Sequence, residues 1–214
     1  MPPTKPTVVV VDDDISVRES LELLIENEGW HPALFESAQA FLARLPTLVP
    51  SCLILDVNLP DLSGLDIQQR ISAEKSSTPI IFITGYGDIP MSVQAMKGGA
   101  IEFLTKPFRD QDLLDGIQLG LARDLVRRES EKALADLRER FGSLSPRERE
   151  IMIRVAQGRL SKQIADDIGI AEATVKVHRS RAMRKMDARS LPELGRMADK
   201  LQLVSDKPNS RTIR

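Results

Sequence analysis

The chain has 214 residues, 42% of them hydrophobic, and a formal net charge of -1; this predicts one large or two small folded domains and excludes a largely disordered chain. Apolar runs such as Val8–Val11 are too short for a membrane span or a signal peptide, and the single cysteine excludes internal disulfides and multi-cysteine zinc sites. We therefore expect a cytoplasmic protein without membrane contact.

The first 121 residues alternate between short apolar runs and stretches with helical spacing. The runs are typical of buried strands, and Asp14 and Ser37 are predicted helix N-caps. The predicted strands are 8–11, 31–35, 51–55, 79–83 and 100–104, and the predicted helices are 14–28, 37–45, 64–74 and 88–97. This order predicts an α/β domain over 1–121, with a doubly wound five-stranded parallel sheet.

A long helix is predicted to follow, from Asp110 to about Arg140, because this segment contains no proline. Gly116 and Gly120 weaken the prediction locally. Residues 122–142 are assigned to a helical linker. Its thin apolar seam consists of Val126, Ala133 and Leu137. Two interpretations stay open for the linker, a coiled coil and a solvated spacer helix.

The remaining chain is predicted to be all helical and basic. Helices are predicted at 145–157, 161–168, 172–186 and 190–203, within a domain over 143–208, and a frayed polar tail at 209–214. Residues 1–121 carry 8 basic and 17 acidic side chains, whereas residues 143–214 carry 16 basic and 9 acidic ones. This asymmetry indicates two domains with different partners, nucleic acid being suited to the basic one; the alternative is scatter of charge over a single domain.

Charged and polar residues follow the predicted strands of the first domain. Asp12, Asp13 and Asp14 follow the first strand, Asp56 the third, Thr84 the fourth and Lys106 the fifth. If the strand order is 2-1-3-4-5, these side chains converge beyond the carboxyl ends of the strands. Clustered carboxylates favour a hard cation such as Mg²⁺, beside which a carboxylate can attack phosphorus. No glycine-rich phosphate loop occurs, so we expect no nucleotide cofactor.

At these positions the sequence resembles the receiver domain of response regulators. The motifs are VVDDD, LDVNLPDLSG, ITGYGD and EFLTKPF, over about residues 5–121. The resemblance implies the flavodoxin-like fold and phosphorylation of Asp56 by a sensor histidine kinase. It also implies further site residues: Asp12 and Asp13 as the acidic pair, Asp13, Asp56 and the Asn58 carbonyl as ligands of Mg²⁺ (or Mn²⁺), Lys106 as the phosphate-binding lysine before a cis proline, and Thr84 and Phe103 as the switch pair.

Several residues also have plain structural interpretations. Asp14 is predicted to cap a helix, and Phe103 is either a switch residue or simply part of the core. His31, Trp30 and Cys52 are interpreted as structural or packing residues.

Residues 161–186 have the pattern of a helix-turn-helix. Ile164 and Ile168 lie on one helix face, Gly169 makes a turn, and Val175, Ala182 and Met186 form the inner face of a second helix. The outer face carries Lys176, Val177, Ser180, Arg181 and Arg184. A basic outer face favours contact with DNA; the alternative is a solvated face on a four-helix bundle.

LSPREREIM, GRLSKQIADDIGI and TVKVHRSRAMRKM resemble the LuxR-type DNA-binding domain, over residues 143–205. With the receiver, the chain is similar to the NarL/FixJ group, closer to its FixJ side. The resemblance implies that Lys176, Val177 and Ser180 face the major groove and that Thr174, Lys162, Arg181 and Lys185 meet phosphates. It places subunit pairing on the Leu191–Leu203 helix.

The sequence thus predicts a phosphorylation-dependent transcriptional regulator of a two-component system. Its expected partners are a sensor histidine kinase, double-stranded promoter DNA, RNA polymerase and, once phosphorylated, a second copy. No enzyme activity is expected beyond self-phosphorylation and autodephosphorylation at Asp56. One alternative is a constitutive DNA-binding protein with the receiver as a dimer scaffold. Another is an aspartyl-phosphate phosphatase, against which Asn58 argues, because such enzymes usually carry a second acid there.

Overall fold

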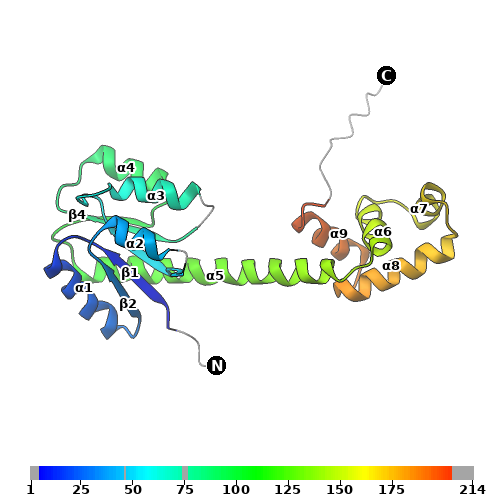
Figure 1. The fold of residues 1–214 in the computed structure, drawn as a ribbon, viewed down its shortest axis with the longest axis horizontal. Helices are drawn as coiled ribbons and strands as arrows, with labels where there is room; N and C mark the ends of the chain where they lie inside the picture. Colours follow the sequence, from blue (N-terminus) through cyan, green and yellow to red (C-terminus); the bar gives the residue numbers. More distant parts are fainter. Residues whose placement is uncertain (1–4, 46, 74–76, 204–214) are drawn as a thin grey trace, which may run out of the picture. The chain divides into compact units, whose positions relative to one another are not determined.

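The computed structural model describes residues 5–45, 47–73 and 77–203. The chain divides into two compact units, Met1–Arg128 and Glu129–Arg214. The predicted tail at 209–214 and the last residues of the predicted domain 143–208 lie outside the described residues. Figure 1 draws the elements of each unit.

The first unit contains a five-stranded parallel sheet in the order β2-β1-β3-β4-β5, which confirms the predicted α/β fold. This is the strand order on which the predicted convergence of the strand-end side chains depends. The strands are β1 (Thr7–Val11), β2 (His31–Phe35), β3 (Cys52–Asp56), β4 (Ile80–Thr84) and β5 (Glu102–Thr105). β1, β3 and β4 are buried along almost their whole length, as expected for strands covered on both faces.

Alternate residues of the strands point into two separate cores. Val9 and Val11 pack toward the helices α2 (Ala38–Arg44), α3 (Gly64–Ala73) and α4 (Ile89–Lys97). Val8 and Val10 pack toward α1 (Ile15–Asn27) and the first turns of α5 (Asp110–Gly142). The sheet is thus the middle layer of three, with side chains buried on both faces.

Strands β3 and β4 end one residue later than the sequence pattern predicts. Asp56 and Thr84 are the last residues of these strands rather than the residues after them. The ladder continues because the Val57 N–H donates to the Ile83 carbonyl at 3.1 Å and the Lys106 N–H donates to the Thr84 carbonyl at 2.7 Å. A polar side chain at the end of an apolar run hides this extension from a pattern based on hydrophobicity.

The predicted long helix is confirmed as α5, a single element of 33 residues. Packing against the sheet explains the two glycines near the start of α5. A Cβ atom on Gly120 would lie 2.9 Å from Cys52 Sγ, and one on Gly116 would lie 3.1 Å from Ile81 Cδ1. The two glycines therefore let the helix approach the sheet closely, which offsets their low helix propensity. The coiled-coil interpretation of the linker stays a prediction.

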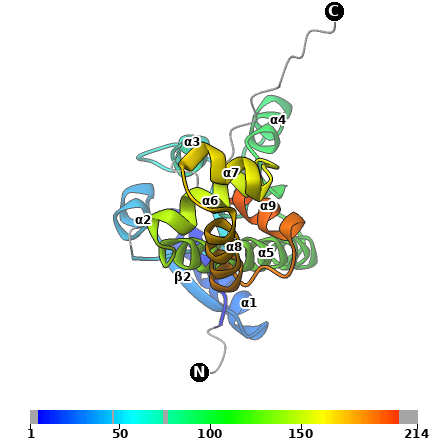
Figure 2. The same cartoon turned by 90° about the vertical axis from the view of Figure 1, so that its right-hand side faces the viewer.

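The second unit is all helical, as predicted. Its elements are the last turns of α5 and the helices α6 (Pro146–Ala156), α7 (Ser161–Ile168), α8 (Glu172–Met186) and α9 (Leu191–Lys200), drawn in Figure 2 from a second side. They surround one core that includes Ile151, Ile164, Val175 and Leu194, all fully buried. None of the helices among the described residues combines the length and apolar character of a membrane span.

The close approach at Gly120 yields a stability prediction. Gly120→Ala is expected to destabilise the first unit by about 1 kcal/mol, because crowding against Cys52 outweighs the gain in helix propensity. Urea unfolding followed by the fluorescence of Trp30, the single tryptophan, which packs on the same core, measures this change.

Gly195→Ala is the matched control. Gly195 also lies in a helix, but a Cβ there meets nothing within 4 Å. This variant should stabilise the second unit by about 0.5–1 kcal/mol and leave the Trp30 transition in place. An unchanged urea midpoint for Gly120→Ala would contradict the packing argument.

Candidate functional site

An acidic pocket forms where the strands of the first unit end. Val11 of β1 pairs with Leu55 of β3. Asp12 and Asp56 are the next residues after this pair, so they occupy equivalent positions on neighbouring strands. Thr84 at the end of β4 pairs with Thr105, directly before Lys106. The sheet order therefore brings together the side chains that the sequence placed at strand ends, as expected for a site at the carboxyl edge of an open α/β sheet.

Lys106 links the two buried carboxylates of the pocket. Its ammonium donates to Asp12 Oδ2 at 2.6 Å and to Asp56 Oδ2 at 2.7 Å. Asp12 is fully buried and Asp56 is 5% exposed. The predicted cis peptide bond between Lys106 and Pro107 is confirmed. The lysine thus fixes the orientation of Asp56, whose other oxygen accepts the N–H of Asn58 at 2.8 Å.

The electrostatics of the pocket follow from burial and from this lysine. Burial raises the pKa of Asp12, although the hydrogen bond from Lys106 works against that shift. Burial alone would lower the pKa of Lys106, but its hydrogen bonds to Asp12 and Asp56 outweigh burial and raise the pKa. The ammonium therefore stays charged, as a permanent cation beside the carboxylates.

The pocket could hold a metal ion. Asp12, Asp13 and Asp56 offer one oxygen each, and these oxygens all lie within 4.8 Å of one another. Lys106 supplies one positive charge against three carboxylates, so the pocket keeps an excess of negative charge. Hard oxygen donors and excess negative charge fit a small divalent cation.

Thr84 is held at the pocket by its neighbours. Its buried hydroxyl accepts the side-chain amide N–H of Asn58 at 3.0 Å and the backbone N–H of Tyr86 at 3.2 Å. The Asn58 side chain is thereby tied to β4. Tyr86 itself is 87% exposed.

Phe103 lies within β5, where it pairs with Phe82 of β4, and it is half-buried. Its ring packs against Phe82, with ring centroids 6.3 Å apart, and joins the core on the α2–α4 side of the sheet. The structure thus places it in the core and next to solvent at once, and both of the predicted interpretations of this residue stand.

Two glycines that the sequence reasoning passed over shape the pocket. A Cβ atom on Gly87 would lie 3.0 Å from Phe103 Cε1 and 3.1 Å from Thr84 Cγ2. A Cβ atom on Gly64 would press against the backbone carbonyl oxygen of Asp56. Both glycines occur inside the motifs around Asp56 and Thr84, so the signal was present in the sequence.

The remaining predicted residues of this unit take structural positions. Asp14 caps α1 by accepting the N–H of Ser16 at 2.8 Å, as predicted. Cys52 is buried, and burial raises the pKa of its thiol to about 12. His31 is exposed at the start of β2, and Trp30 packs on the core next to it.

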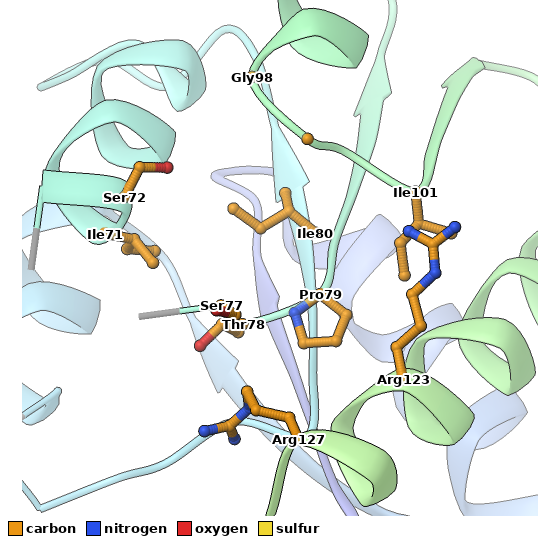
Figure 3. Close-up of a pocket in the computed structure, with 11 residues that line it drawn as sticks. Ile71, Ser72, Ser77, Thr78, Pro79, Ile80, Gly98, Ile101, Arg123 and Arg127 are labelled. Carbon is orange, nitrogen blue, oxygen red and sulfur yellow. The ribbon is translucent and has the colours of Figure 1, made fainter. Parts of the chain in front are cut away.

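A cavity of about 580 Å³ lies elsewhere in the first unit (Figure 3). Its lining comes from the end of α3, the start of β4, the α4–β5 loop and α5, and includes Ile80, Gly98, Arg123 and Arg127. None of the predicted site residues lines it, and it lies near the amino ends of β4 and β5. The cavity is therefore separate from the acidic residues at the carboxyl ends of the strands.

The second unit contains the predicted helix-turn-helix. α7 ends at Gly169, which has a φ of 67° in the left-handed region, and α8 begins three residues later. Val175, Ala182 and Met186 form its buried face, as predicted. The structure leaves these candidate DNA-facing residues exposed: Lys162, Thr174, Lys176, Val177, Ser180 and Arg181. Lys185 is exposed as well.

Lys185 differs from these residues. Its ammonium donates to Glu148 Oε2 at 2.7 Å and to the Ser143 carbonyl at 3.2 Å. Glu148 is 4% exposed and completes a capping box with Ser145 at the start of α6. Lys185 therefore contacts α6 while its side chain stays 41% exposed, and its phosphate contact stays a prediction. The hydrogen bond from Lys185 lowers the pKa of Glu148.

Comparison with known families accounts for both units. Residues 8–118 match the family described as "Response regulator receiver domain". Residues 142–198 match the family described as "Bacterial regulatory proteins, luxR family". Together the two matches cover most of the chain in the order that the motifs predict.

Relatives align with this chain over nearly its whole length. Nodulation protein W of Bradyrhizobium diazoefficiens is 51% identical over 95% of this chain and 89% of the relative. Transcriptional regulatory protein FixJ of the same species is 40% identical over 95% of this chain and 99% of the relative. The low-resolution structure of the response regulator StyR has a TM-score of 0.78 and 46% identity, over 92% of this chain and 99% of that one.

The pairing of Lys185 with Glu148 yields a prediction about acid stability. Lys185→Met should destabilise the second unit by about 1–2 kcal/mol at neutral pH, because it removes a charged hydrogen bond from a buried carboxylate. A carboxyl group whose folded pKa is lowered stabilises the fold above its unfolded pKa, and this contribution is lost as the pH falls through the folded pKa. The difference between variant and wild type should therefore shrink below about pH 4.

Thermal unfolding followed by circular dichroism between neutral and acid pH measures this difference. Arg184→Met is the control, because Arg184 is an exposed cation one residue away on the same helix. A constant difference across the pH range would contradict a stabilising pair between Lys185 and Glu148.

Proposed function

Because this chain belongs to the NarL/FixJ type of two-component response regulators, we propose that Asp56 is the residue phosphorylated by a sensor histidine kinase. Proteins of this type are phosphorylation-dependent transcriptional regulators that join a receiver to a LuxR-type DNA-binding domain, and the chain is one of them. The observation that carries the proposal for Asp56 is the bridge from Lys106 to Asp12 and Asp56 at the carboxyl edge of the sheet.

The hydrogen bonds of Asp56 orient its carboxylate for phosphoryl transfer. A carboxylate oxygen of Asp56 attacks the phosphorus of a phosphohistidine, and the new P–O bond forms while the P–N bond breaks and the imidazole nitrogen leaves. Lys106 orients Asp56 before the transfer and binds a phosphoryl oxygen after it, because its charge stays fixed in the pocket. The Thr84 hydroxyl supplies a further hydrogen bond to the phosphoryl group.

A divalent cation completes the pocket. Asp13, Asp56 and the backbone carbonyl of Asn58 would hold Mg²⁺ or Mn²⁺, and Asp12 adds negative charge beside them. When bound, the cation neutralises charge that develops on the phosphoryl oxygens.

Phosphorylation is read out through Thr84 and Phe103. When Thr84 turns to the phosphoryl group, it gives up its hydrogen bonds with Asn58 and Tyr86. Phe103, half-buried beside it, turns inward, and the surface formed by α4 and β5 changes. Phosphate acts here as a ligand that shifts the population between two states, one of which pairs with a second copy.

The output is binding to double-stranded promoter DNA. Lys176, Val177 and Ser180 face the major groove, while Lys162, Thr174 and Arg181 meet phosphates. Two DNA-binding domains of a phosphorylated dimer reach two half-sites together, where RNA polymerase is the further partner. Lys185 pairs with Glu148, so its contact with a phosphate requires that it exchange this partner, as Lys176 would exchange Glu172.

Phosphate-dependent pairing is tested by the solution mass. With Mg²⁺ alone the protein should sediment as a monomer, and with Mg²⁺ plus beryllofluoride, an aspartyl-phosphate mimic, as a dimer. Asp56→Asn should stay monomeric under both conditions. Asp66→Asn is the matched control, since this exposed carboxylate lies on α3 outside the pocket, and it should pair like the wild type.

Dimerisation of Asp56→Asn with beryllofluoride would contradict a role for Asp56. A dimer under every condition would favour the constitutive regulator, in which the receiver serves only as a scaffold. Turnover of a phosphoester substrate would favour the aspartyl-phosphate phosphatase.

Base readout by α8 is tested at Lys176. Among the residues that the structure describes, Lys176 pairs with Glu172 alone, at 2.8 Å on the same exposed helix face, so its ammonium can exchange this partner for DNA. Lys176→Ala should weaken binding to a selected operator by about 1–3 kcal/mol and weaken binding to random DNA less. An equal loss on both DNAs in a fluorescence anisotropy titration would assign Lys176 to phosphates.

A further inference from the structure

The basic residues of α8 do not all point the same way. The helix carries five lysines and arginines: Lys176, Arg179, Arg181, Arg184 and Lys185. Arg181 and Arg184 are exposed, and among the described residues neither has an ion-pair or side-chain hydrogen-bond partner. Lys176 is exposed with a partner on its own helix. Arg179 and Lys185 instead contact other helices of the unit.

Arg179 lies one helical turn from Val175 and from Ala182, on the stripe of α8 that faces the core. It is half-buried, and its Nη1 donates to Ser161 Oγ at 3.0 Å. Ser161 is 9% exposed and is the first residue of α7. This hydrogen bond joins the two helices of the helix-turn-helix directly.

The hydrogen bond between Arg179 and Ser161 is positioned to restrain the angle between α7 and α8. Gly169 supplies the turn at one end of α7, and Ser161 lies at the other end. A hydrogen bond far from the turn restrains the angle between the two helices more than one close to the turn, because a small change of angle moves distant atoms farther. The guanidinium provides a planar, directional donor for this purpose.

We infer that Arg179 is a positioning residue that sets the recognition helix α8 against α7, and that it acts through Ser161 without touching DNA. The inference rests on the proposed function, in which the opposite face of α8 enters the major groove. It divides the cations of α8 into two classes. Arg179 and Lys185 hold the helix in the unit, and Arg181 and Arg184 are available to phosphates.

The two classes have different signatures in DNA binding. A cation that neutralises a phosphate releases counterions, so its loss weakens binding to every sequence and lowers the salt dependence. A residue that only positions the recognition helix leaves the number of phosphate contacts unchanged. Its loss misaligns the side chains that read bases, so it weakens binding to the preferred sequence alone.

The experiment measures the full-length protein on two duplexes of equal length. One is recovered by selection from a random pool with the wild-type protein, and the other has random sequence. The variants are Arg179→Met, Ser161→Ala and the double variant, with Arg181→Met as the matched control. Dissociation constants are measured over a series of salt concentrations, and circular dichroism confirms the helix content of each variant.

Arg179→Met and Ser161→Ala should each weaken binding to the selected duplex about tenfold, as expected for the loss of one base contact. Their binding to the random duplex and the salt slope should match the wild type. The double variant should lose no more than either single variant, because the two residues act through one hydrogen bond. Arg181→Met should weaken binding to both duplexes and lower the slope by about one.

Three results would overturn the inference. A lowered salt slope for Arg179→Met would make it a phosphate contact like Arg181. Unchanged binding to both duplexes would remove any role in recognition. Losses that add in the double variant would show that Arg179 does not act through Ser161. If Arg179→Met loses helix content, the decision passes to Ser161→Ala, which removes only one hydroxyl.

Failure of the DNA-binding role gives a different result. Wild-type protein that binds neither duplex in a salt-dependent way would overturn the nucleic-acid function itself. A second outcome would retain that function and reject only the positioning role. In it, the wild type binds DNA, Arg181→Met binds more weakly, and Arg179→Met binds like the wild type.

Discussion

The ammonium of Lys106, bound between Asp12 and Asp56, is the interaction on which the first unit's chemistry depends. Two buried carboxylates on neighbouring strands repel each other, and burial makes each charge costly. A cation held at 2.6 and 2.7 Å offsets both effects and orients Asp56. The parallel order of the strands is what lets a lysine after β5 reach residues at β1 and β3.

The two units use charge in opposite ways. In the first, negative charge is concentrated where Asp12, Asp13 and Asp56 meet at the strand ends, an arrangement that could hold a metal ion. In the second, positive charge is spread along one exposed helix face, where it suits an extended polyanion. The ion pair of Lys185 with Glu148 and the hydrogen bond of Arg179 with Ser161 show that part of this basic character serves the fold.

Sequence patterns predicted the strands and helices well, because apolar runs and helical spacing are strong and continuous here. They failed where a residue's neighbour comes from a distant segment. Gly116 and Gly120 counted as weak points of a helix, whereas the sheet beneath α5 leaves no room for a Cβ. The contact of Lys185 with Glu148, distant in sequence, was likewise not predicted.

The amino-acid sequence alone was enough to predict the fold class, the family and the polar residues at the strand ends, whereas the strand order entered only as a condition. These follow from local periodicity and from short motifs, which require no knowledge of packing. The tertiary structure decided which donor meets which acceptor: Lys106 with two carboxylates, Thr84 with Asn58, Arg179 with Ser161 and Lys185 with Glu148. Such pairs join segments far apart in the chain, and only the packing of helices and strands brings their atoms within hydrogen-bond distance.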